Sequence, residues 1–231
     1  NFAIIGLTLA ESLGGPAGVG IATILSAFSI PTFNILAVIS LTMFVSSENG
    51  KKANLKDVLV KIAKNPLIIG VVCGLICLGI RSLIPVNKSG NPVFSLSESL
   101  PFVYTAIKNV AKISSPLALI ILGGMFDFSA VRGMLKQIII GTAFRVAIVP
   151  FVVIGLAVIL SRYTNIINFD ATVYPSLIAL FGSPVAVSSA IMAQEMDNDG
   201  VLAGQLVVWT SIASIFSLFI SVLILRSIGL L

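Results

Sequence analysis

The residues best placed to do chemistry interrupt an apolar stretch, and the chemistry they suggest is ligand binding by freed backbone groups. Residues 172–193 are apolar enough to cross a bilayer, yet they contain Phe-Gly-Ser-Pro, which ends in Ser183 and Pro184. Proline removes a backbone N–H and clashes with the preceding turn. Unpaired backbone groups persist in a membrane only where protein or a water-filled cavity covers them, so the break indicates a polar site. A proline kink without function remains the alternative.

The other candidate binding residues are glycine or uncharged polar residues inside apolar spans. An amide offers two donors and an acceptor, and glycine lets another backbone approach closely. Small and polar residues also mediate helix packing in membranes, and serine hydroxyls often bond back to their own helix, so a structural role stays open for each. These candidates are Asn1, Gly6, Asn34, Ser188, Thr210 and Ser214.

Arg145 is the one charge deep in a span without an obvious partner. A buried arginine is costly in a membrane and usually faces protein or water. We favour a structural role, in which it pairs with a carboxylate from helices outside this chain or reaches toward the cytoplasmic surface. Contact with an anionic ligand is the second interpretation.

The composition restricts the protein to the membrane class. Of 231 residues, 57% are hydrophobic and 10% are charged, and the mean hydropathy is +1.11. Soluble domains carry about a quarter charged residues, so this is a polytopic membrane protein. The chain has no histidine, and it shows neither a phosphate loop nor paired catalytic carboxylates. We therefore expect no enzyme activity, no metal and no cofactor, and we read Cys73 and Cys77 as packing residues.

Positive charge orients the spans. The net charge of +5 does not indicate nucleic acid as a partner, because most lysines and arginines lie in loops between apolar spans. The loop at 46–64 carries five lysines, which places it in the cytoplasm. The predicted elements are a half-helix at 1–13 and spans at 19–45, 66–84, 99–126, 135–160, 172–193 and 201–225.

Two parts of the chain repeat one order of features. The half-helix at 1–13 is followed by an acidic, glycine-containing turn and the long span at 19–45. The broken span at 172–193 is followed by an acidic loop and the long span at 201–225. The number of spans between them makes the two long spans run in opposite directions, as an inverted repeat requires.

Four segments resemble the auxin efflux carrier family, which includes plant carriers and many bacterial permeases. Residues 1–9 resemble its first crossover, 64–66 its Lys-Asn-Pro start of a span, 115–123 its Pro-Leu-Ala…Leu-Gly helix, and 182–195 its second crossover. Their order and spacing match along essentially the whole chain. One departure is Thr8, which stands where the first crossover usually has proline.

The resemblance implies an all-α polytopic transporter of inverted repeats with two crossing broken helices, whose first helices are missing from this chain. It implies an elevator-like motion of a transport part against a scaffold. By similarity, 1–47 ends the first repeat in the transport part, and 48–65 is a cytoplasmic loop. Residues 66–126 are scaffold helices, and 127–231 complete the transport part with the second crossover.

The expected function is secondary transport of a small organic anion or carboxylate across the cytoplasmic membrane, in which the chain is a multi-pass protein. Opposed half-helix ends supply partial positive charge and free amide groups, which suit an anion. Coupling to protons or to sodium and assembly as a homodimer remain open. The alternatives are a sodium-coupled symporter resembling the bile acid carriers and a non-transporting membrane sensor or structural subunit.

Overall fold

The computed structural model describes residues 2–43, 56, 60, 63–64, 66–87, 92–124, 126–164 and 169–231. These residues are all-α, as predicted, apart from one isolated β-bridge between Val86 and Pro92. The elements, in which η marks a π-helix, are η1 (Phe2–Gly6), α1 (Leu7–Met43), α3 (Pro66–Leu83), α4 (Leu96–Ser99), α5 (Pro101–Gly124), α6 (Ala130–Ala143), η2 (Phe144–Ile148), α7 (Val149–Tyr163), α8 (Val173–Gly182), α9 (Val187–Glu195) and α10 (Gly200–Ser227).

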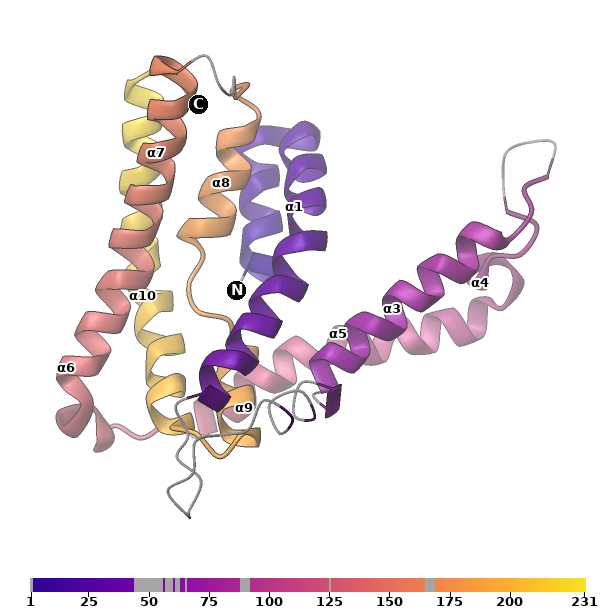
Figure 1. Cartoon of the computed structure of the whole chain (residues 1–231), viewed down its shortest axis with the longest axis horizontal. Coiled ribbons are helices and arrows are strands. Elements are labelled where there is room, and N and C mark those ends of the chain that lie inside the picture. Colours follow the sequence, from indigo (N-terminus) through magenta and orange to yellow (C-terminus); the bar gives the residue numbers. More distant parts are fainter. Residues whose placement is uncertain are drawn as a thin grey trace. The chain divides into compact units, whose positions relative to one another are not determined.

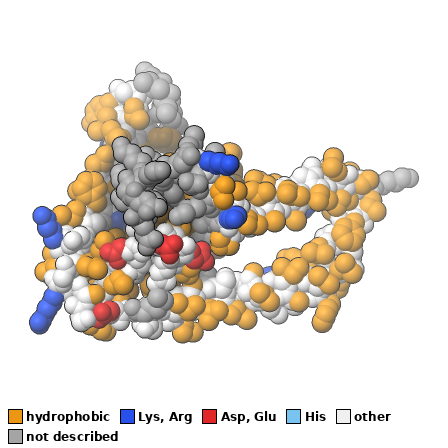
Figure 2. Space-filling model, turned by 60° about the horizontal axis from the view of Figure 1, so that its bottom comes forward, with side chains coloured by type: hydrophobic (Ala, Val, Ile, Leu, Met, Phe, Trp, Pro, Cys, Tyr) orange, Lys and Arg blue, Asp and Glu red, His pale blue; other side chains and the backbone are white. Residues whose placement is uncertain are grey.

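The surface and the helix lengths define a multi-pass membrane protein. Large hydrophobic side chains such as Phe28, Phe102 and Phe216 are more than two-thirds exposed. Figure 2 shows hydrophobic side chains over most of the visible helical surface, and lipid is the solvent that suits such a surface. In the described part of the chain, five helical stretches are long and apolar enough to cross a membrane: Leu7–Leu41, Pro101–Gly124, Ala130–Tyr163, Val173–Glu195 and Gly200–Ser227.

The chain divides into two compact units. The first comprises Asn1–Phe33 and Met125–Leu231, and the second comprises Asn34–Gly124. In the second unit, α3 leads through the short α4 into α5, which returns in the opposite direction (Figure 1). The broken helix lies in the first unit. The assignment of a transport part and a scaffold remains a prediction.

In the first unit, α1 folds back on itself at Gly15, where the sequence predicts a loop. Gly15 has φ 57° and ψ −152°, a backbone conformation that is essentially restricted to glycine. A methyl group at Gly18 would lie 2.7 Å from the carbonyl oxygen of Ala10, so the two limbs pack with their backbones nearly in contact. The result is a short helix followed by a long antiparallel one (Figure 1).

The second short and long pair is α9 and α10, and it follows the predicted break. Helix α8 ends at Gly182, and Ser183 and Ala186 both have extended backbone before α9 begins at Val187. Asp199 then caps α10 by accepting a hydrogen bond of 2.8 Å from the backbone N–H of Leu202. In Figure 1, α10 runs in the direction opposite to the long limb of α1, as an inverted repeat requires.

The span predicted at 135–160 is longer and less regular than its periodicity indicates. Helices α6, η2 and α7 form one continuous stretch from Ala130 to Tyr163. Within η2, the N–H of Val149 bonds to the carbonyl of Phe144, five residues back, which widens the turn. The predicted loop at 46–64 falls almost entirely outside the described residues.

Candidate functional site

The break between α8 and α9 lies about halfway along the candidate membrane span Val173–Glu195. Helix α8 has 10 residues and is therefore about 15 Å long, half of a hydrocarbon core of about 30 Å. Helix α9 has 9 residues and is of similar length. In Figure 1 the extended connection is the thin, non-helical segment directly below α8. Polar backbone groups in the middle of a span need protein partners or a water-filled cavity.

Three of the candidate residues hold this break in place. Ser183 and Pro184 are fully buried, and the Ser183 hydroxyl donates to the carbonyl of Ala179, one turn back in α8. The hydroxyl oxygen of Thr210, on α10, accepts a hydrogen bond of 3.0 Å from the N–H of Val185. Thr210 is itself fully buried. Its side chain therefore supplies the partner that a regular helix would have supplied to Val185.

The first crossover meets the second at Gly6. A methyl group at Gly6 would lie 3.0 Å from the carbonyl oxygen of Ala179 and would overlap the ring of Phe2. Helix η1 contacts α8, and Phe2 and Ala179 share one buried cluster. Glycine thus allows the backbone of the N-terminal segment to approach α8, as the sequence predicts. Asn1, the neighbouring candidate, lies outside the described residues.

Helix α9 begins at the break without a side-chain cap. Its cap residue is Ala186, which has no side-chain oxygen to offer the first N–H groups, although the Ala186 carbonyl accepts from the N–H and hydroxyl of Ser189. Helix starts carry partial positive charge and N–H donors that suit an anion. Ser188 is half-buried in this first turn, so its hydroxyl lies beside the same helix end.

Arg145 contacts the end of α8, on the side of the break opposite to the start of α9. The sequence does not predict this contact. Its guanidinium Nη1 donates a hydrogen bond of 3.3 Å to the carbonyl oxygen of Phe181, near the end of α8. The last carbonyls of a helix lack intrahelical partners and carry partial negative charge. The signal in the sequence was the unpaired charge itself, and its contact depends on how η2 packs against α8.

Two candidates remain apart from this group. Ser214 is buried, but its hydroxyl donates 2.9 Å to the carbonyl of Ser211 in its own helix, which is the structural alternative for that residue. Asn34 is half-buried on α1 and belongs to the second unit, so its role in the site remains a prediction. In the described part of the chain, no group of three His, Cys, Asp or Glu side chains lies close enough to hold a metal.

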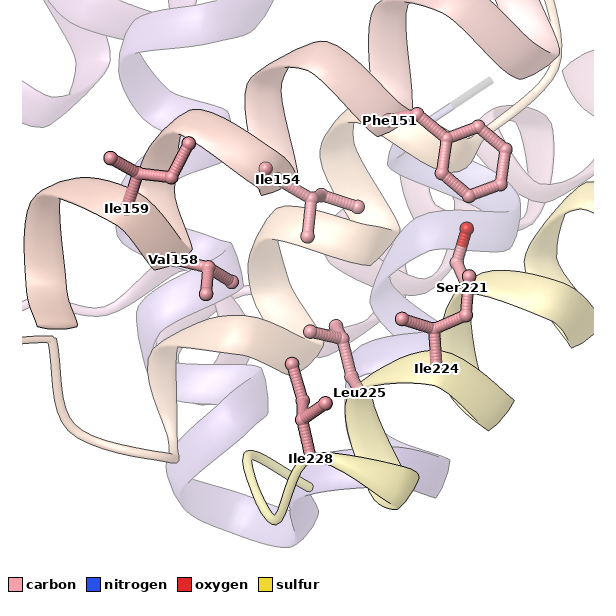
Figure 3. A pocket seen from close by; sticks show the side chains of 9 residues that line it. Phe151, Ile154, Val158, Ile159, Ser221, Ile224, Leu225 and Ile228 are labelled. Atoms are coloured by element: carbon pink, nitrogen blue, oxygen red, sulfur yellow. The ribbon is translucent and has the colours of Figure 1, made fainter.

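A separate apolar cavity of about 290 Å³ lies between α7 and α10. Figure 3 shows Ile154 and Val158 of α7 opposite Ser221 and Leu225 of α10. The Ser221 hydroxyl donates to the carbonyl of Ser217, so it serves its own helix. Ser221 is 11 residues beyond Thr210, which is about 16 Å along α10. The cavity is therefore distinct from the break.

The loop before α6 contacts the N-terminal part of α10. The buried amide of Gln205 donates 2.7 Å to the backbone carbonyl of Asp127 and accepts from the indole N–H of Trp209. Hydrogen bonds from the Ser129 hydroxyl and N–H hold the pKa of the exposed Asp127 carboxyl below its ordinary value. Both contacts order the chain at the end of the span.

These features define a class of protein before they define a family. A membrane helix broken near its middle, together with two short-and-long helix pairs whose long helices run in opposite directions, is an architecture that secondary transporters use. A family model described as membrane transport protein matches residues 1–222. The chain therefore belongs to this family of membrane transporters, which confirms the resemblance to auxin efflux carriers. Comparison with curated proteins and with solved structures finds no match.

Proposed function

We propose that this permease moves a small organic anion, a carboxylate, across the cytoplasmic membrane by secondary active transport. The observation that carries the proposal is the extended connection from Ser183 to Ala186, in which Ser183 and Pro184 are buried. It lies halfway along a candidate membrane span and is followed by the start of α9, which has no side-chain cap. A carboxylate can accept hydrogen bonds from the N–H groups at a helix start, and its negative charge complements the partial positive charge there.

In this proposal the candidate residues have separate roles. Ser183, Pro184 and Thr210 keep the backbone open, Gly6 lets the first crossover approach it, and the hydroxyl of Ser188 donates to the anion. Asn1 adds an amide from the first crossover. Residues 1–47 and 127–231 form the transport part, and 66–126 form the scaffold.

Flux measurements on the full chain in proteoliposomes test this function. Acetate, malonate, succinate and benzoate are the probes, each measured with an imposed proton gradient and then with a sodium gradient. We expect saturable uptake of at least one of these carboxylates, driven by one of the two gradients. Protein-free liposomes are the control. Absence of protein-dependent flux for every carboxylate would contradict the proposed substrate class.

The variant Thr210→Val tests the role of the break. Valine has nearly the shape of threonine but leaves the part-buried N–H of Val185 without its acceptor, at a cost of about 1–3 kcal/mol. We expect carboxylate uptake to fall by about tenfold or more, since 1.4 kcal/mol corresponds to a factor of ten. Thr210→Ser keeps the hydroxyl and should keep most of the uptake. Equal uptake by the valine variant would separate Thr210 from the site.

A further inference from the structure

Arg145 is a cation within a candidate membrane span, and the described helices that pack against its own helix contain no carboxylate. It lies in the span Ala130–Tyr163, and its helix η2 contacts α6, α7, α8 and α10. None of these five elements contains an aspartate or a glutamate. In proteins an arginine keeps its charge, and a charge at this depth needs compensation. A carboxylate from helices outside this chain, the partner favoured from the sequence, stays a prediction, as does reach toward the cytoplasmic surface; the elements that pack against η2 supply no such carboxylate.

The hydrogen bond that the Arg145 guanidinium makes uses one of its N–H donors. An arginine has five N–H donors in a planar fork. Among the described residues, the Phe181 carbonyl is the one hydrogen-bond acceptor that Arg145 contacts, at 3.3 Å. That carbonyl is neutral, and it lies two residues before Ser183. The bond therefore orients the guanidinium beside the break without neutralising its charge.

Arg145 lies in a π-helical turn, and a side chain of the neighbouring helix α10 stabilises that turn. Residues Phe144–Ile148 form a π-helix, a conformation that is rare and often found at functional sites. Pro150 cannot donate to the carbonyl of Val146 four residues back. The buried hydroxyl of Ser217, on α10, donates to that carbonyl instead. The widened turn is thus supported from the neighbouring helix, on which Thr210 also lies.

We propose that Arg145 is the charge-selecting residue of the anion site at the break. Its planar fork donates two parallel hydrogen bonds to the two carboxylate oxygens of the substrate, a geometry that lysine cannot reproduce. The contact with the Phe181 carbonyl, two residues before Ser183, holds the guanidinium near the break. This inference rests on the proposed function, and it adds that the site distinguishes a carboxylate from a neutral molecule of the same shape.

Paired ligands test this assignment on the purified full chain. Calorimetric binding is measured for acetate and acetamide, succinate and succinamide, and benzoate and benzamide. In Arg145→Gln we expect at least a tenfold loss of carboxylate affinity and less than a threefold change for the amides. Arg145→Lys, which keeps the charge but not the fork, should lose about threefold to tenfold for the carboxylate and keep the preference for it.

Arg162→Gln is the matched control, because Arg162 also donates to a helix-end carbonyl, that of Ile228, at 2.6 Å, but is exposed. We expect it to bind carboxylates as the parent does. A folded Arg145→Gln variant that binds carboxylates with parental affinity would overturn the assignment and leave Arg145 as a cap of α8. If that variant does not fold, parental carboxylate affinity in Arg145→Lys would overturn it. A parent that neither binds nor transports any probe would instead refute the proposed function.

Discussion

Hydroxyl groups of α10 complete the backbone of two other segments. The Thr210 side chain accepts from the N–H of Val185 at the break, and the Ser217 side chain donates to the carbonyl of Val146 below Pro150. By contrast, the hydroxyls of Ser211 and Ser214 bond within α10. Some hydroxyls of the serine-rich last span thus bond to other segments, and others follow the common pattern of bonding to their own helix.

Asn1 carries the residue-scale prediction that rests on sequence alone. Replacing Asn1 with alanine in the full-length carrier should reduce carboxylate transport without reducing the amount of protein in the membrane. A buried amide lost from a binding site leaves its partners unsatisfied, at about 1–3 kcal/mol, or roughly tenfold to hundredfold in affinity. Proteoliposome flux gives the measurement.

Ser46→Ala is the control for Asn1→Ala, because Ser46 lies at the predicted end of its span and should tolerate the change. Equal flux through the Asn1 variant and the parent would make Asn1 a packing residue. The break at Ser183 and Pro184 would then be the remaining binding candidate from the sequence.

At the scale of elements, two short helices are each turned back onto a long one, and different devices make the two turns. The first turn depends on Gly15, whose backbone conformation other residues rarely adopt. The second depends on Asp197, with φ 55°, and on Asp199, which caps α10. Aspartate tolerates a positive φ better than most residues, so this turn forms without glycine.

The first turn gives a sharp stability test. Gly15→Ala places a side chain at φ 57° and should destabilise the fold by about 1–3 kcal/mol. Gly20→Ala is the matched control on the same helix, because Gly20 is helical and a methyl group there meets nothing within 4 Å. Alanine favours a helix over glycine by about 1 kcal/mol, so this variant should be as stable as the parent or more so.

Thermal unfolding of the purified chain in detergent compares the two variants. A lower Tm for Gly15→Ala together with an unchanged or higher Tm for Gly20→Ala is the expected result. Equal Tm values for the two variants would mean that the reversal of α1 does not depend on the conformation of Gly15.

At the scale of the molecule, the helix ends of the first unit group into two sets, and which set faces the cytoplasm stays a prediction from the sequence. Arg162, at the end of α7, reaches the carbonyl of Ile228 beyond α10, so these two helix ends lie together. The start of α6 and the loop after α9 lie at the opposite end of the unit (Figure 1). The sequence places the former end outside and the latter in the cytoplasm, because basic residues concentrate near cytoplasmic loops.

Thiol labelling of intact cells tests this orientation. Cys73 and Cys77 are first replaced with serine, because both are exposed. We expect Ser47→Cys, next to the lysine-rich loop, to resist a membrane-impermeant reagent, and Val93→Cys, in the predicted outer connection, to react. Permeabilised cells provide the control for both sites. Labelling of the Ser47→Cys variant from outside intact cells would reverse the map.

The sequence by itself determined the spans, the turn at Gly15 and the break at Pro184. Each follows from local physics: the apolar length that a bilayer requires, the conformational freedom of glycine, and the donor that proline lacks. The family follows as well, because four segments of the sequence resemble its motifs in order and its family model matches residues 1–222. The irregular turn at Phe144–Ile148 does not follow from hydrophobic periodicity, which reports which face is apolar and not how its backbone is hydrogen-bonded.

Only the tertiary structure decided which polar groups meet. Arg145 contacts the Phe181 carbonyl, and Thr210 accepts from Val185, over separations of 36 and 25 residues. A sequence pattern shows that such groups need partners in a membrane, because none is left unpaired there without cost. The partner itself depends on the packing of α8 against η2 and α10. For that reason the break could be located from the sequence, whereas the position of Arg145 beside it could be seen only in the fold.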